Sequence, residues 1–91
     1  MENTVKAEER LDTSTANKFD EDVMGAITGE CEKLYIDMED TTYISSICLR
    51  TLRNAFRKMK SQGGIMVLKN VKPSIMEILE ITGFAGNFII E

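Results

Sequence analysis

The stretch Tyr43-Ile44-Ser45-Ser46-Ile47-Cys48-Leu49-Arg50 decides how this chain folds, because it joins a short apolar segment to an amphipathic helix. The first N–H groups of a helix lack partners inside the helix, and the helix dipole places partial positive charge there. A serine at this point can cap the helix, or it can carry a phosphate that the helix terminus accommodates. The pattern leaves both alternatives open for Ser45 and Ser46, and either serine fits the capping position.

A helix is predicted after the serine pair by apolar residues that recur at intervals of three and four. These residues are Leu49, Leu52, Phe56 and Met59, and the outer side carries Arg50, Arg53, Arg57, Lys58 and Lys60. The apolar run 34–36 predicts a strand over residues 33–38, and the continuous apolar run 65–68 predicts another on the other side of this helix. Such runs are typical of parallel strands buried on both faces, and the connection is long enough for a parallel pair.

The same periodicities divide the rest of the chain. Residues 1–11 alternate weakly and predict a short edge strand, and residues 12–15 are helix-capping types. A helix of about fifteen residues then follows and ends near Gly29. Pro73 begins a third helix, Gly83 ends it, and residues 88–90 form a last strand. The order β-α-β-α-β-α-β predicts an α/β fold in a single domain over residues 1–91.

Charge is distributed unevenly along the chain. The net charge is −4, but residues 1–45 carry four Lys or Arg against twelve Asp or Glu, whereas residues 46–91 carry seven against three. Two interpretations stay open: two solvated helix faces of opposite sign, or a polarised protein-binding surface that steers partners. Nucleic acid is not an expected partner, since the basic residues share one helix without interleaved aromatic residues.

Composition excludes several classes of protein. No apolar run approaches the roughly 20 residues that cross a bilayer, and the polar, acidic N-terminus does not resemble a signal peptide. We therefore expect a cytoplasmic protein with no membrane partner. Cys31 and Cys48 lack metal-binding spacing and are expected to be reduced core residues. The absence of histidine removes the commonest general base and metal ligand, and we expect neither a metal nor a cofactor.

Candidate catalytic groups are few. Asp37 and Asp40 could pair for acid–base chemistry, but no substrate pocket is indicated by their surroundings. Gly63-Gly64 precedes a strand rather than a helix and does not form a phosphate loop. The acidic residues 20–22 are contiguous on a helix and cannot converge on one ion. The six methionines mostly fall at core spacing.

Four motifs together resemble the STAS domain, the fold of bacterial anti-sigma factor antagonists. Tyr43 to Arg50 resembles the strand-to-helix motif of that family, and Arg10-Leu11-Asp12-Thr13-Ser14-Thr15-Ala16 is similar to the opening of its first helix. Residues 63–73 and 79–84 resemble two later passages in the correct order. The likeness is strongest from about residue 10 onward. It implies a small STAS-type fold, with helices packed on a mixed four-stranded sheet and a first hairpin that is shortened.

The resemblance also implies a function. The phosphorylated residue of the family is the serine that follows an Asp or a Ser at the helix start, which corresponds to Ser46. The unphosphorylated domain binds an anti-sigma factor that is also a serine kinase, and the sigma factor is released. Phosphorylation separates the complex and a phosphatase resets it. The implied partner-binding residues are Asp12, Thr13, Thr42, Tyr43, Ser45, Ser46, Ile47, Arg50 and Arg53.

An alternative remains within the same fold. Ile47 and Cys48 stand where the family usually has a small residue and a glycine, which crowds the first turn of the helix. A STAS-like scaffold, or an accessory subunit of a signalling or transport complex, would bind without phosphorylation and would use Ser46 only as a cap. In both interpretations the chain is a binding module and not an enzyme.

Overall fold

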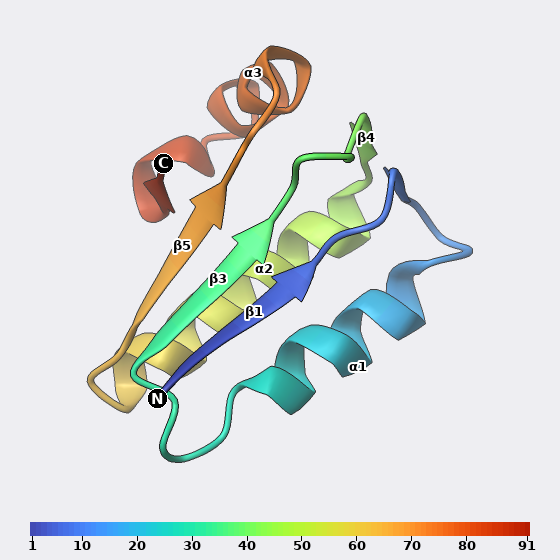
Figure 1. The fold of residues 1–91 in the computed structure, drawn as a ribbon. Coiled ribbons are helices and arrows are strands. Elements are labelled where there is room, and N and C mark those ends of the chain that lie inside the picture. The colour runs from blue at the N-terminus through green and yellow to red at the C-terminus, as the bar shows by residue number, and fades with distance from the viewer.

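The computed structural model describes residues 1–91, with the exception of the side chain of Asn87. Three helices accompany six strands and a short 3-10 turn (Figure 1). In chain order the elements are β1 Glu2–Lys6, β2 Arg10–Leu11, α1 Ala16–Ala26, β3 Lys33–Asp37, β4 Tyr43–Ile44, α2 Ser46–Ser61, β5 Ile65–Lys69, α3 Pro73–Ile81, η1 Ala85–Asn87 and β6 Ile89–Ile90. The order of the predicted elements is therefore confirmed, with β2 and β4 as additions.

The main sheet has four strands in the order β1-β3-β5-β6. The predicted α/β fold class is confirmed, but the expectation of a mixed sheet is wrong, because every strand pair is parallel. The reason lies at the N-terminus, where β1 runs directly beside β3 instead of folding back in a hairpin. The register places Thr4 opposite Tyr35, Tyr35 opposite Val67, and Val67 opposite Ile89.

Only one face of this sheet is covered by helices. Val5, Leu34 and Ile36 are buried, whereas Thr4 is exposed and Tyr35 is half-buried, so burial alternates along β1 and β3. The spatial order of the strands follows the chain, and right-handed crossovers then place every helix on the same side. Figure 1 shows α2 passing behind the strands. The expectation that the strand at residues 33–38 is buried on both faces is therefore wrong.

The first helix is shorter than expected. It covers 11 residues and ends at Ala26, because Ile27 leaves helical geometry at φ −91° and ψ 78°. The side-chain amide of Asn3 donates to the carbonyl oxygen of Ala26 at 2.7 Å and satisfies one of the carbonyls left over at this end. Gly83, at φ 81°, directly follows the last capping residue of α3, as the sequence predicted.

The core lies between the sheet and its helices. It includes the side chains of Leu11, Phe19, Val23, Leu34, Ile36, Met38, Leu52, Met59, Met66, Leu68, Ile75 and Leu79. Cys31 and Cys48 are unpaired and buried, as expected of small core residues. Phe88 closes the core beside α2, with its ring 5.8 Å from that of Phe56 and 6.0 Å from that of Phe84. No helix in the described structure is long and apolar enough to cross a bilayer.

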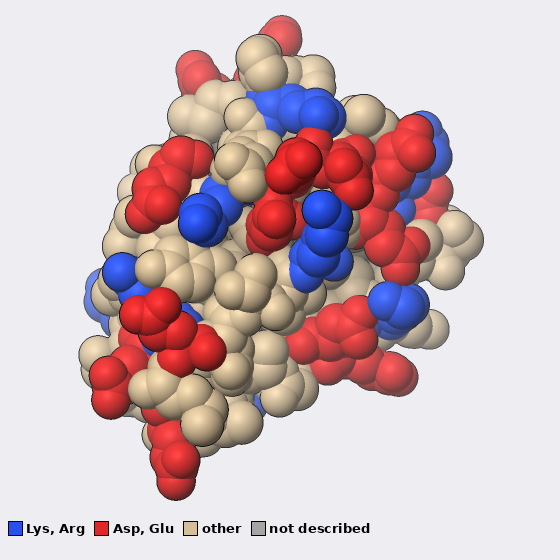
Figure 2. Space-filling view, in the orientation of Figure 1, with Lys and Arg blue, Asp and Glu red and all other residues tan. Residues whose placement is uncertain are grey.

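Acidic and basic side chains are mixed on the face shown in Figure 2, so this face does not carry a single sign of charge. Ion pairs within the first half of the chain contribute to the mixing, such as Lys6 with Asp40 at 3.5 Å and Lys18 with Asp22 at 2.9 Å. The basic residues of α2 differ, because none of them makes an ion pair with the described side chains. The unneutralised positive charge is therefore concentrated on α2.

Candidate functional site

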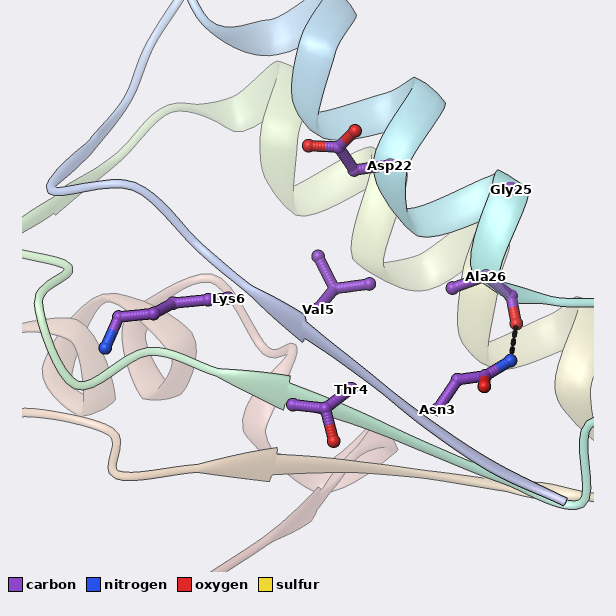
Figure 3. A pocket seen from close by; sticks show the side chains of 7 residues that line it. All are labelled: Asn3, Thr4, Val5, Lys6, Asp22, Gly25 and Ala26. Atoms are coloured by element: carbon purple, nitrogen blue, oxygen red, sulfur yellow. Dashed lines mark hydrogen bonds between the residues drawn. The ribbon is translucent and has the colours of Figure 1, made fainter.

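One hollow of about 540 Å³ lies between β1 and α1, where Lys6 and Asp22 border it (Figure 3). It is open and polar, and none of the residues that the sequence singled out as functional contributes to its lining. Val5 points from β1 toward α1 in this view, and Thr4 points to the other side of the strand. The candidate site is instead at the opposite end of α1, where α2 begins.

Two short strands bring the predicted motifs together. β2 pairs with β4 in parallel, with Arg10 opposite Tyr43 and Leu11 opposite Ile44. The N–H of Ser45 continues this pairing by donating to the carbonyl oxygen of Leu11 at 2.7 Å. The segment that opens the first helix therefore lies directly beside the start of α2, although the two are more than thirty residues apart.

The two serines have different positions. Ser45 is the capping residue of α2, with an extended backbone at φ −87° and ψ 164°, and Ser46 is the first helical residue. The carbonyl oxygen of Ser45 accepts from the N–H groups of Cys48 at 3.1 Å and Leu49 at 3.0 Å. The hydroxyl of Ser45 is buried and has no partner among the described atoms, so it does not cap the helix through its side chain.

Ser46 is exposed at the first turn of α2. Two large apolar side chains near it in the sequence, Tyr43 three residues before and Ile47 directly after, are also exposed, at 40% and 44%. Arg50 follows Ser46 by four residues, a spacing that places both side chains on one side of the helix. Ser46 is thus an accessible hydroxyl at a helix N-terminus, with exposed apolar side chains nearby in the sequence and the Arg50 guanidinium one turn away.

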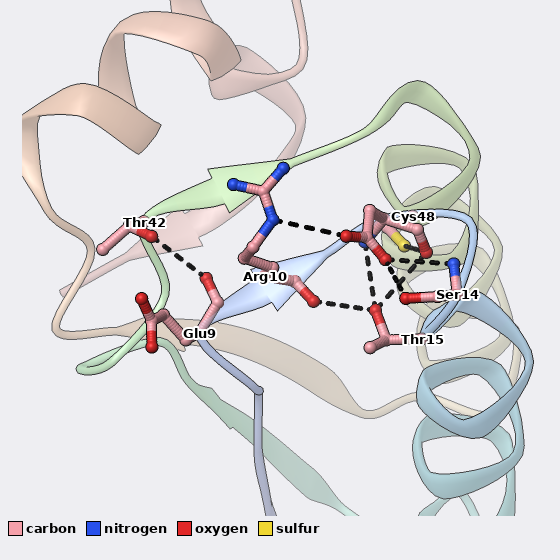
Figure 4. A network of polar contacts seen from close by, with 7 residues as sticks. Glu9, Arg10, Ser14, Thr15, Thr42 and Cys48 are labelled. Atoms are coloured by element: carbon pink, nitrogen blue, oxygen red, sulfur yellow. Dashed lines mark hydrogen bonds and ion pairs between the residues drawn. The ribbon is translucent and has the colours of Figure 1, made fainter.

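The loop beside Ser46 is held by polar contacts (Figure 4). Asp12 binds the Nε of Arg10 at 3.3 Å, the N–H of Ser14 at 3.0 Å and the hydroxyl of Ser14 at 2.6 Å. The contacts with Ser14, partly opposed by desolvation, lower the pKa of the Asp12 carboxyl. The guanidinium of Arg10 lies 4.6 Å from the centre of the Tyr43 ring, a cation–π contact. Asp12 and Tyr43 are therefore fixed on one surface.

The remaining residues of this region have structural contacts. The hydroxyl of Thr42 donates to the carbonyl oxygen of Glu9 at 3.3 Å, and its N–H donates to the same oxygen at 2.8 Å. Thr13 is exposed in the loop between β2 and α1. Cys48 is buried beneath the loop, and burial raises the pKa of its thiol. The side chain of Cys48 is therefore part of the core and not of the exposed surface.

A narrow groove of about 190 Å³ runs from this surface between α1 and α2. Ile47 and Arg50 line it from α2, and Asn17 and Asp20 line it from α1. The hydroxyl of Thr51 donates to a carboxylate oxygen of Asp20 at 3.2 Å and links the two helices at the base of the groove. The groove extends the surface around Ser46 toward Asn17 and Asp20 of α1.

Arg53 lies farther along α2 than the other predicted residues. It is half-buried and borders a separate depression with Phe56, Arg57 and Lys60. Its spacing of seven from Ser46 keeps it on the same side of the helix. The structure thus brings Asp12, Tyr43, Ser45, Ser46 and Ile47 to one end of α2, and places Arg53 at the far margin.

A sequence model of the STAS domain matches residues 3–91. The chain belongs to the STAS domain family. No curated protein sequence matches it. Among solved structures, an anti-sigma-factor antagonist (STAS) domain protein from Planctomyces limnophilus has a TM-score of 0.81 at 21% identity, with 91% of this chain and 72% of that chain covered. These values show that the predicted STAS fold is correct.

Two other structures show how widely this fold is used. A sulfate transporter family protein from Wolinella succinogenes has a TM-score of 0.81 at 14% identity. The match covers 98% of this STAS domain and 75% of the Wolinella chain. The anti-sigma factor antagonist SpoIIAA, a Bacillus cell fate determinant, is known in unphosphorylated and phosphorylated forms. Its unphosphorylated form has a TM-score of 0.74 at 13% identity, and the match covers 97% of this STAS domain and 76% of the SpoIIAA chain. Likeness at such identities shows the fold alone.

Asp37 and Asp40 do not form an acid–base pair in this STAS domain. One carboxylate oxygen of Asp37 accepts from the side-chain amide of Asn70 and from the N–H of Glu39, each at 3.0 Å. These contacts, the Asn70 amide first, lower the pKa of Asp37, whereas a general acid needs a raised one. Asp40 is paired with Lys6 instead.

Sequence reasoning missed several residues of this STAS domain that shape the site. Arg10 makes a cation–π contact with Tyr43, and Asp20 lines the groove between α1 and α2. Thr51 of α2 donates a hydrogen bond to Asp20 of α1. Asp20 and Thr51 did belong to predicted helices, but periodicity alone does not state which flank of one helix meets the other. The pairing of Arg10 with Tyr43 depends on strands of two residues, which are too short to produce an alternation.

Proposed function

We propose that this STAS domain is a partner-binding module whose docking surface surrounds Ser46 and is switched off by phosphorylation of that residue. In its unphosphorylated form it binds an anti-sigma factor that is also a serine kinase, and this binding releases a bacterial sigma factor for transcription. Transfer of phosphate to Ser46 separates the complex, and a phosphatase restores the hydroxyl. The domain acts in the cytoplasm as a kinase substrate and not as an enzyme.

The observation that supports this proposal is the division of roles between the two serines. Ser45 provides the backbone geometry that starts α2, so Ser46 is not needed as the cap. The Ser46 side chain is exposed between Tyr43 and Ile47, the two apolar residues best placed to contact a partner. The known phosphorylated form of SpoIIAA is consistent with a switch on this fold.

Phosphate acts on the fold and on the interface in opposite ways. It adds about −1.5 to −2 charges at the positive end of the α2 dipole, four residues before Arg50, where the folded domain accommodates it. A partner that covers Tyr43 and Ile47 would have to strip water from the same charge, and this desolvation cost can exceed what the contact with Arg50 returns. The fold therefore survives and the complex dissociates. Asp12, Thr13 and Thr42 border this surface, and Arg50 and Arg53 extend it along α2.

Phosphosite mapping tests the proposal. We expect incubation with the cognate anti-sigma kinase and ATP to add one phosphate, which mass spectrometry of proteolytic fragments locates on Ser46. The Ser46→Ala variant should remain unmodified. Ser74 provides a matched comparison, because it is also an exposed serine in the first turn of a helix, but its neighbour Ile75 is buried and Ile78 stands where Ser46 has Arg50. Modification of Ser74 or Ser45 instead of Ser46 would contradict the assignment.

A further inference from the structure

An apolar cleft of about 360 Å³ lies at the edge of the sheet, between the second half of α2 and the C-terminal segment. Phe56 and Lys60 line it from α2, and Gly64 precedes the strand that forms its floor. The other lining residues are Ile65, Met66, Gly86, Phe88 and Ile89. The cleft exists because β6 pairs only with Val67 and Leu68, so it leaves the first part of β5 without a neighbour on its outer side.

A cationic depression adjoins this cleft. Phe56 and Lys60 also line the adjoining depression, whose other residues are Arg53 and Arg57. Arg53 is half-buried, and its Nε is buried without a hydrogen-bond partner among the described atoms. A buried donor without an acceptor is costly, particularly on a charged group, so the protein alone leaves the Arg53 guanidinium incompletely satisfied. None of these three cations makes an ion pair with a described side chain.

We propose that this cleft binds a single-chain amphiphile with an anionic head, of which a long-chain fatty acid is the simplest form. The tail lies against Phe56, Met66 and Phe88, and the carboxylate lies among Arg53, Arg57 and Lys60. Sites for small ligands typically have about 300 to 1,000 Å³, mostly apolar walls and a few placed polar groups, and the cleft matches each of these properties.

The charge pattern favours a small amphiphile over an acidic peptide. Lys60 lines both the apolar cleft and the depression that holds Arg53 and Arg57, so the cations gather beside Lys60 and are not spread along the cleft, which suits one head group and one tail. An acidic peptide would need cations spread along its length. This inference does not depend on the switch at Ser46, because its test uses the isolated full chain without kinase, ATP or partner.

The test is a titration of the full chain with dodecanoate below its micellar concentration, followed through backbone amide NMR signals. Dodecanol supplies the same tail without charge, and butyrate supplies the charge without the tail. We expect dodecanoate to shift the amide signals of Gly64 and Gly86, and dodecanol and butyrate to bind at least tenfold more weakly. Arg53→Gln and Lys60→Gln should each weaken dodecanoate binding roughly tenfold, because each removes one charge-assisted hydrogen bond to the carboxylate. Lys58→Gln removes a charge from the same helix outside the cleft and should leave the affinity for dodecanoate unchanged.

A blocking variant gives a second readout. A Cβ on Gly86 would have no heavy atom within 4 Å, so Gly86→Leu is expected to fold normally and to fill the cleft. It should abolish the dodecanoate shifts while the remaining spectrum is unchanged. The proposal is overturned if dodecanoate shifts no cleft residue, if neutralising Arg53 and Lys60 has no effect, or if an acidic peptide binds these residues and dodecanoate does not.

Discussion

Adjacent serines take on separate tasks at the start of α2. Ser45 directs its backbone carbonyl into the helix and its N–H to Leu11, so the local fold depends on the main chain of this residue. Ser46 makes no side-chain hydrogen bond within the described structure and projects from an exposed position. The sequence predicted a functional serine here but left the capping residue open, because both serines have the same intrinsic preference and only the backbone dihedrals distinguish them.

The stability of a charged variant separates the fold from the switch. We expect Ser46→Asp to melt about 1–4 °C above wild type, because a negative charge in the first turn interacts favourably with the helix dipole and with Arg50. Thermal unfolding followed by circular dichroism measures this shift. The double variant with Arg50→Gln should keep only part of the gain. A Ser46→Asp domain that melts well below wild type would show that position 46 is not suited to a negative charge.

Asp37 provides a pH-dependent test at the scale of one residue. Its pKa is lowered in the folded state, so its contribution to stability is present above the unfolded-state pKa and is lost as pH falls through the folded value. Asn70 has φ 57°, which glycine adopts freely, so Asn70→Gly removes the amide without straining the backbone. We expect this variant to raise the NMR titration midpoint of Asp37 toward the usual value of about 3.9. An unchanged midpoint would assign the lowered pKa to another contact.

At the scale of elements, the connection between β2 and β4 assembles the candidate site. The sequence identified both flanking motifs, one before α1 and one before α2, and it predicted that they border the same surface. It did not predict the strands that join them, because each has two residues and carries no periodic signal. The end of α1 likewise has a tertiary contact, that between Asn3 and Ala26, which local patterns do not contain.

Gly64 and Gly25 differ in the space that is available for a side chain. A Cβ on Gly64 would lie 2.6 Å from the terminal methyl of Met59 and 2.9 Å from the carbonyl oxygen of Glu32. Backbone cannot move away as easily as a side chain, so Gly64→Ala should destabilise the domain by about 1–3 kcal/mol. Gly25 is in α1 with nothing within 4 Å of its Cβ position, so Gly25→Ala should stabilise by up to about 1 kcal/mol. Urea unfolding measures the free energy of unfolding of both variants. Equal changes in the two variants would contradict the close packing around Gly64.

At the scale of the whole molecule, sequential right-handed crossovers explain both what was predictable and what was not. The alternation of apolar strands and amphipathic helices gave the α/β class directly. The open face of the sheet was not predicted, because Tyr35 and Val67 continue the apolar runs even though they point away from the helices. Val67 is only 1% exposed without a helix over it, since neighbouring strands carry side chains that cover it, including Tyr35 beside it in register.

The charge asymmetry of the sequence has a defined location in the molecule. The ion pairs formed by the lysines and arginines of β1, β2 and α1 reduce the local charge of the first half, whereas the five basic residues of α2 stay free of such pairs in the described structure. This positive helix begins at Ser46 and ends beside the apolar cleft. The polarised surface that the sequence left as one of two interpretations therefore corresponds to one helix, with a proposed site at each end.

The affinity of the anti-sigma kinase for four forms of the domain tests the central claim most directly. Isothermal titration calorimetry should give equal dissociation constants for wild type, Ser46→Ala and the control Ser74→Asp. Ser46→Asp should bind roughly thirtyfold more weakly or worse, because complex formation has to desolvate the added charge in the interface. Equal binding by Ser46→Ala and Ser46→Asp would contradict the switch, and would favour a scaffold that binds its partner without phosphorylation.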